Sequence, residues 1–135
     1  MEGKHMNEAM ISDYMSAAPH TIGQEQSLAK AHEIMREFSI RHLPVLHGGK
    51  LVGTVSLRDL DLTEGLEGVD PAKVPVLEAM SIEPHVVTRD TPLKDVVSHL
   101  VEHGYGSAIV VEGKEVVGVF TAIDAMRALR DLQAG

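Results

Sequence analysis

Two segments of the sequence carry the same polar pattern: a glycine, then a hydroxyl side chain, then an aspartate three residues later. Residues 53–59 supply Ser56 and Asp59, and residues 118–124 supply Thr121 and Asp124. A hydroxyl at the start of a helix lies beside unpaired backbone amides, which favour phosphate. A carboxylate one turn later can accept two hydrogen bonds from a vicinal diol such as that of ribose. The pattern therefore fits a nucleotide site, and it also fits a helix-capping box without a ligand.

The two segments belong to a longer internal repeat. Residues 11–60 align with residues 76–125 without a gap, and the shared residues include Met-Ser at 15–16 and 80–81. Copies this short cannot each bury a large core, so we expect them to pack on each other. The predicted organisation is an expression-vector remnant at 1–6, a first repeat at 7–62, a linker at 63–75, a second repeat at 76–132 and a tail at 133–135.

The hydrophobic pattern predicts the order β-α-β-β-α in each repeat. Apolar residues recur at helical spacing after Ser27 and after Thr91, which we expect to cap the two helices. A second helix closes each repeat. The predicted strands lie at 21–22, 43–46 and 51–55 in the first repeat and at 86–87, 108–111 and 116–120 in the second, with hairpin turns at 47–50 and 112–115.

Composition excludes several classes of function. The 12 basic residues are outnumbered by 20 acidic ones, which argues against a broad surface for duplex nucleic acid. The sequence contains no cysteine, so disulfides, zinc sites built from thiolates and cysteine nucleophiles are excluded. No apolar run reaches the length of a membrane helix. We expect a cytoplasmic protein without a membrane partner.

With this order and duplication, the sequence resembles a tandem pair of CBS domains, named after cystathionine β-synthase. The resemblance is carried by the Met-Ser dipeptides, the strand at 41–45, the strands at 51–53 and 116–118, and the two segments that end at Asp59 and Asp124. It implies a mixed α+β fold in which the two β-α-β-β-α repeats pack about a pseudo-twofold axis into one compact module. It also implies a homodimer and a regulatory role rather than an enzymatic one.

The resemblance further implies two clefts for an adenosine-containing ligand, each built from both repeats. In one cleft, Arg41 is available for a phosphate, and in the other Tyr105 offers a face for adenine. The first cleft is expected to combine Thr21, Ile40, Arg41 and His42 with Thr121 and Asp124. The second is expected to combine Val86, Tyr105, Gly106 and Ser107 with Ser56, Arg58 and Asp59.

The implied function is sensing of AMP, ADP, ATP, S-adenosylmethionine or NAD as a regulatory ligand, with the bound state passed to an unidentified protein partner. No cofactor is expected. One alternative is an interaction or dimerisation module without a ligand, suggested by Ile109 and Ile123, which replace the Pro44 and Arg58 of the first repeat.

A second alternative is divalent-metal binding by His99 and His103, which stand four residues apart on a predicted helix. The same stretch fits the H-x-x-E-H pattern of a class of metallopeptidases. The first repeat has no matching histidines, however, and no third ligand is evident. The acidic residues Asp61, Glu64, Glu67 and Asp70 lack the spacing of a calcium loop, so we expect them to be solvated charges.

Overall fold

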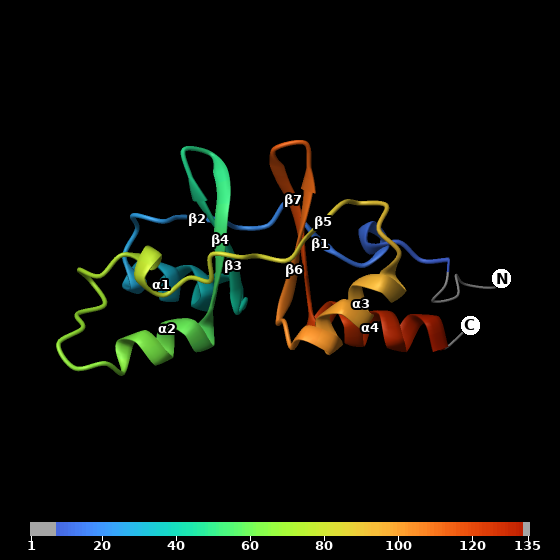
Figure 1. Ribbon diagram of the computed structural model, residues 1–135. Coiled ribbons are helices and arrows are strands. Elements are labelled where there is room, and N and C mark those ends of the chain that lie inside the picture. The colour runs from blue at the N-terminus through green and yellow to red at the C-terminus, as the bar shows by residue number, and fades with distance from the viewer. Residues whose placement is uncertain (1–7, 134–135) are drawn as a thin grey trace. The chain divides into compact units, whose positions relative to one another are not determined.

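A computed structural model describes residues 8–133, which form two compact units (Figure 1). Within that range, unit 1 consists of residues 8–19 and 85–133, and unit 2 consists of His20–Pro84. The segment at 8–19 therefore packs with the second repeat, and the segment at 76–84 packs with the first. The predicted vector remnant at 1–6 and the last two residues of the predicted tail lie outside the described residues.

Unit 2 contains a three-stranded sheet in the order β2-β3-β4, with β2 parallel to β3 and β3 antiparallel to β4. Figure 1 shows α1 and α2 on the same side of the β3–β4 hairpin. The apolar stripe of α1 enters a core with the two hairpin strands. The elements are β2 (Ile22–Gly23), α1 (Leu28–Phe38), β3 (His42–His47), β4 (Lys50–Ser56), α2 (Leu57–Glu64) and the 3-10 turn η2 (Val76–Glu78).

Unit 1 contains a four-stranded sheet in the order β1-β7-β6-β5. Its edge strand β1 comes from the N-terminal segment and pairs antiparallel with β7. Phe120 is fully buried in the core of this unit, beside residues of α3 and α4. The elements are η1 (Ile11–Asp13), β1 (Ser16–Ala17), β5 (Val86–Val87), α3 (Leu93–His103), β6 (Ser107–Glu112), β7 (Glu115–Thr121) and α4 (Ala122–Gln133).

The expected α+β class and the order β-α-β-β-α in each repeat are confirmed. Ser27 caps α1 as predicted, because its hydroxyl accepts a hydrogen bond from the Lys30 amide at 3.0 Å. The predicted cap of α3 is wrong. The N-cap is Pro92, and the hydroxyl of Thr91 instead accepts a hydrogen bond from the Thr88 amide at 3.2 Å. None of the helices among the described residues has both the length and the apolar character needed to cross a membrane.

The segment after α2 is bound to the rest of unit 2. Helix α2 extends to Glu64, so the first two residues of the predicted linker are helical. Further along, the Val74 and Pro71 carbonyls accept hydrogen bonds from the Leu28 and Ala29 amides, each at 2.9 Å. These amides belong to the first turn of α1 and have no partner within that helix. The linker therefore stabilises the start of α1.

Candidate functional site

The Ser56–Asp59 pair lies where β4 ends and α2 begins. Ser56 is the N-cap of α2, and its hydroxyl accepts a hydrogen bond from the Asp59 amide at 3.1 Å. The Asp59 Oδ2 in turn accepts one from the Ser56 amide at 2.9 Å. This is a complete capping box. Among the described residues, Oδ1 of Asp59 accepts no hydrogen bond, and the side chain is only half-buried.

Asp124 occupies the matching position of unit 1 but has a different environment. The residue is 2% exposed, and its Oδ2 accepts a hydrogen bond from the Thr121 amide at 3.0 Å. Its Oδ1 accepts one from the Ser16 hydroxyl at 3.2 Å and one from Arg127 Nη1 at 3.1 Å. Both carboxylate oxygens of Asp124 are therefore already engaged within unit 1. Of the two aspartates, only Asp59 has a carboxylate oxygen that accepts no hydrogen bond from the described residues.

The other predicted residues of unit 2 divide between this junction and the core. His42 pairs with Ser56 across the β3–β4 ladder, and the Leu57 amide donates to the Arg41 carbonyl at 2.9 Å. Arg41 and Arg58 are exposed. Ile40 packs against the core, and Thr21 directly precedes β2. Unit 2 therefore gathers Arg41, His42, Ser56 and Asp59 at one end of its hairpin.

Burial lowers the pKa of His42 below its ordinary value. The negative charge of Asp59 acts in the opposite direction, and the positive charge of Arg41 lowers this pKa further. The imidazole is therefore neutral at neutral pH, and it can donate one hydrogen bond and accept another. It offers a neutral polar group beside the charged Asp59.

In unit 1, Ser107 pairs with Thr121 at the corresponding end of the β6–β7 hairpin. Val86 lies in β5, and Gly106 precedes β6. The predicted clefts combine residues of both units, for example Arg41 with Thr121, and this combination stays a prediction. Within the units, Arg41 and His42 lie with Ser56 and Asp59, whereas Ser107 lies with Thr121.

Tyr105 lies in a group of rings that the sequence analysis did not connect. Its ring centroid is 5.8 Å from those of His85 and His99 and 5.4 Å from that of His103. The His85 and His99 rings are stacked with centroids 4.0 Å apart. His99 and His103 were recognisable as neighbours from their spacing on α3. His85 was not, since it precedes β5, and Tyr105 was not, since it lies beyond the C-terminal end of α3.

The geometry of this group predicts a low pKa for His85. Burial lowers the pKa of His85 from 6.5, and the positive charges of His99 and His103 lower it further. Because the unfolded chain then binds the proton more readily, the stability that the neutral ring contributes is fully present above about pH 6.5. This stability is lost as the pH falls below that value towards the pKa of His85 in the folded protein.

A proton NMR titration should give a midpoint below 6.5 for His85, whose signal is assigned with the His85→Gln variant. In His99→Ala the midpoint should rise, and a midpoint of 6.5 or higher in the parent protein would contradict the account.

The two Met-Ser dipeptides prove to be the partners of the two motif glycines. A side chain at Gly53 would collide with the Ser81 carbonyl and Met80, and one at Gly118 would collide with Met15. Ser16, which holds Asp124, belongs to the same dipeptide as Met15. Sequence reasoning missed these contacts, although the identity of the dipeptides at 15–16 and 80–81 was the signal that could have found them.

Comparison with known proteins places these observations in a family. The model of the CBS domain matches residues 11–61 and 76–131. The A-adding tRNA nucleotidyltransferase of Geobacter sulfurreducens is 28% identical over 118 residues, which are 86% of this chain and 13% of that protein. The CBS domain-containing protein YhcV of Bacillus subtilis is 25% identical over 93% of this chain and 89% of its own length.

Solved structures are similar over nearly the whole chain. The CBS domain pair of protein MJ0100, crystallised with 5'-methylthioadenosine and S-adenosyl-L-methionine, has a TM-score of 0.82 and 25% identity, covering 90% of this chain and 96% of its own. The protein CBSX2, crystallised with AMP, has a TM-score of 0.79 and 26% identity, covering 92% of this chain and 98% of its own.

Proposed function

Because the chain belongs to the CBS domain family, we propose that it is a regulatory module that binds an adenosine-containing small molecule. The observation that carries the proposal is the half-buried Asp59, whose Oδ1 accepts no hydrogen bond from the described residues, at the junction of β4 and α2. The similarity to CBS domain pairs that were crystallised with AMP and with S-adenosyl-L-methionine supports the ligand class.

In this proposal Asp59 Oδ1 accepts hydrogen bonds from the ribose hydroxyls. The carboxylate does not need to rearrange, since Oδ2 keeps its bond to the Ser56 amide while Oδ1 binds the ligand. Arg41 and Arg58 are exposed and permanently charged, so either can pair with a phosphate. His42 can bind a further polar group of the ligand.

For Asp124 we propose a role that differs from the ligand contact implied by the family resemblance. A ribose at Asp124 would have to displace the Ser16 hydroxyl or the Arg127 guanidinium from Oδ1. Both exchanges break a hydrogen bond to a buried carboxylate, which costs stability. We therefore assign ligand binding to the unit 2 junction and a structural role to Asp124. Thr121, Val86, Gly106, Ser107 and Tyr105 remain candidates for contacts with the base or a phosphate.

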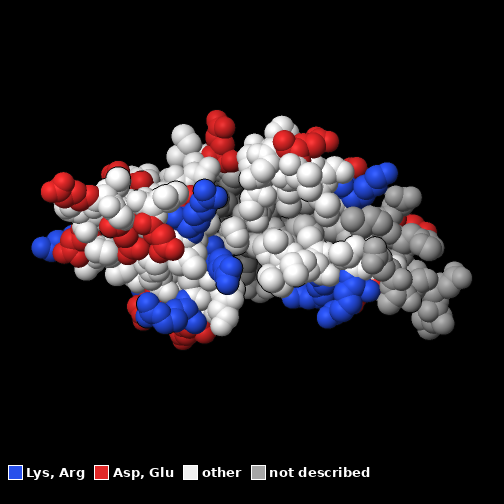
Figure 2. Space-filling view, turned by 90° about the horizontal axis from the view of Figure 1, so that it is seen from below, with Lys and Arg blue, Asp and Glu red and all other residues white. Residues whose placement is uncertain are grey.

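Apolar side chains exposed on unit 1 favour a second function, association with another chain. Val101 is 76% exposed, and Ile123, Met126 and Leu129 follow one another at helical spacing on α4 with more than half of each side chain exposed. In the view of Figure 2, the surface of unit 1 has a broad area without charged side chains. Exposed apolar surface of this kind is typical of interaction sites. We propose that the module forms a homodimer and signals to a protein partner.

A thermal-shift screen tests the proposed ligand class. The ligands are AMP, ADP, ATP, S-adenosylmethionine and NAD, with GMP as the matched control for the base. A ligand at about 100 times its dissociation constant adds roughly 2.7 kcal/mol to the free energy of unfolding, which raises the melting temperature by several degrees. We expect a shift with at least one adenosine compound and a smaller one with GMP. No shift with any of them, after mass spectrometry has excluded a retained ligand, would favour the interaction module.

A further inference from the structure

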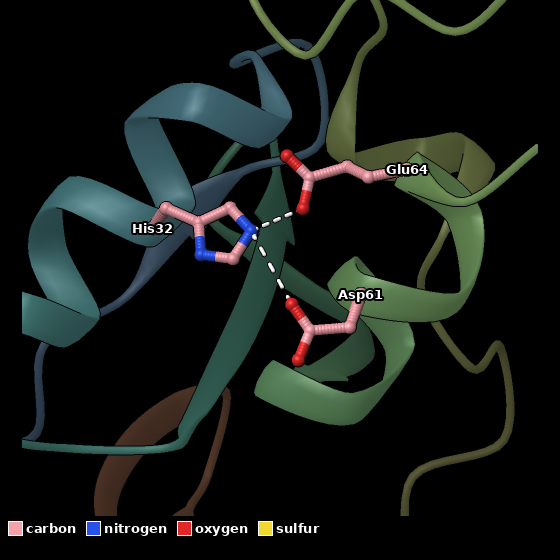
Figure 3. A group of neighbouring side chains, drawn as sticks. All are labelled: His32, Asp61 and Glu64. Atoms are coloured by element: carbon pink, nitrogen blue, oxygen red, sulfur yellow. Dashed lines mark hydrogen bonds and ion pairs between the residues drawn. The ribbon is translucent and has the colours of Figure 1, made fainter.

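We propose that unit 2 contains a binding site for a divalent transition-metal ion, with zinc as the best fit, formed by His32, Asp61 and Glu64. Figure 3 shows the His32 ring on α1 pointing toward both carboxylates on α2. One nitrogen, Nε2 of His32, faces Oε2 of Glu64 in direct contact and Oδ1 of Asp61 at 3.9 Å. The three ligand atoms all lie within 4.8 Å of one another.

These separations suit a metal ion after a small adjustment. Zinc binds imidazole nitrogen and carboxylate oxygen at about 2.0–2.2 Å, so neighbouring ligand atoms of a tetrahedral site are about 3.3 Å apart. Asp61 would move towards the histidine, and Glu64 would move slightly away from it. Asp61 is free to do so, because its side chain is 66% exposed. Three protein ligands leave a fourth position for water or another molecule.

The charges of the group favour a cation. With a neutral imidazole, the group carries two negative charges, and the Glu64 side chain is only 19% exposed. Neither carboxylate forms an ion pair with a lysine or arginine of the described residues. Figure 2 shows acidic side chains gathered over the surface of unit 2. A divalent ion would neutralise the charge of the two carboxylates.

The position of the two carboxylates on α2 also favours a bound cation. Asp61 and Glu64 lie in the last turn of α2, which contains no basic residue. The carbonyl groups at a helix C-terminus carry partial negative charge, so carboxylates there are unfavourable and a cation is stabilising. A bound ion would therefore also relieve the repulsion between the carboxylates and the end of α2.

A hollow in the surface borders two of the three proposed ligands, His32 and Glu64, and leaves room for water beside them. It measures about 590 Å³, and its other lining residues are Ala29, Glu33, Arg36 and Pro71. Imidazole among the ligands selects zinc and its neighbours over magnesium and calcium, which prefer oxygen ligands alone. Among the described residues, His32, Asp61 and Glu64 form the only group of three or more histidine or acidic side chains close enough together to hold a metal ion. The site is independent of the proposed adenosine site, which uses other side chains.

Zinc titration of the full chain tests the site. The melting temperature is measured once with Zn²⁺ and once with EDTA. The pH is set to about 7.5, because the side chains must be deprotonated to bind the metal. Zn²⁺ should raise it by several degrees in the parent protein and have no such effect in His32→Ala or Glu64→Gln. The matched control is His47→Ala, which removes an exposed histidine that pairs with Glu25 at 2.6 Å in the same unit. This variant should respond like the parent, as should His99→Ala combined with His103→Ala.

A second variant keeps the test valid if His32→Ala does not fold. Asp61→Asn alters an exposed side chain and removes a negative charge from the C-terminal end of α2, so its melting temperature in EDTA should be equal to or slightly above that of the parent. Its zinc affinity, measured by calorimetry, should be at least about tenfold weaker, since one charged ligand is lost. An equal zinc shift in the parent and in Glu64→Gln would overturn the proposal. So would no shift in the parent, or a shift that disappears only when His99 and His103 are replaced.

Discussion

Asp124→Ala is expected to lower the free energy of unfolding by about 3–4 kcal/mol, because it removes a buried carboxylate that accepts three hydrogen bonds. The Thr121 amide and the Ser16 hydroxyl would lose their acceptor, and the first turn of α4 would lose its capping carboxylate. The bond to Ser16 joins positions 108 residues apart, so its loss also weakens the attachment of the N-terminal segment to unit 1. A fall in melting temperature of roughly 10 °C should accompany the change.

The matched control for this prediction is Asp59→Ala, which alters the equivalent position of the first repeat. Asp59 is half-buried and accepts one hydrogen bond, from the Ser56 amide, so its loss should cost about 1 kcal/mol. Urea unfolding curves of the two variants give both values. Equal losses of stability would contradict the structural role assigned to Asp124.

Gly53→Ala is the second substitution with a large expected effect, at about 3 kcal/mol. The added Cβ would overlap the carbonyl oxygen of Ser81. Next to this contact, Thr54 and Ser81 form an isolated bridge with backbone hydrogen bonds of 3.0 and 2.8 Å. Relief of the overlap requires a backbone shift that stretches these hydrogen bonds. Overpacking of this kind typically lowers the free energy of unfolding by about 1–3 kcal/mol.

Gly118→Ala provides the matched comparison, since Gly118 is the repeat equivalent of Gly53. Its added Cβ would meet the side chain of Met15 rather than a backbone atom. Methionine is flexible and can move aside, so the cost should be about 1 kcal/mol. Denaturant unfolding of both variants measures the difference. A Gly118→Ala variant that is destabilised as much as Gly53→Ala would show that the two glycine contacts are equivalent.

The elements were predictable where a single local pattern determines them. Leu28, Ala31 and Met35 recur at helical spacing, and they form the buried face of α1. Gly104, a residue type typical of helix ends, terminates α3 with φ +68°, a backbone conformation that favours glycine. The cap at Thr91 was wrong because Pro92 takes the N-cap position and the Thr91 hydroxyl bonds backwards to Thr88.

The site was only partly predictable, because its chemistry depends on contacts across the chain. Asp59 and Asp124 stand in the same local motif. Nothing in that motif indicates that Asp59 is half-buried, whereas Asp124 is buried with both carboxylate oxygens accepting hydrogen bonds. The difference arises from Ser16, which the fold brings to Asp124 from the distant N-terminal segment, and from Arg127. Glu64 was expected to be a solvated charge, but the packing of α1 and α2 brings it into contact with His32, which is 32 residues away in the chain.

The most direct test of the account is a calorimetric titration of the parent protein and of Asp59→Asn with the adenosine compound that gives the largest thermal shift. Asparagine can still cap the Ser56 amide, so the melting temperature without ligand should change little. The loss of a charged acceptor for the ribose should weaken binding at least about tenfold. Equal affinities in the parent and in Asp59→Asn would contradict the claim that this carboxylate holds the ligand.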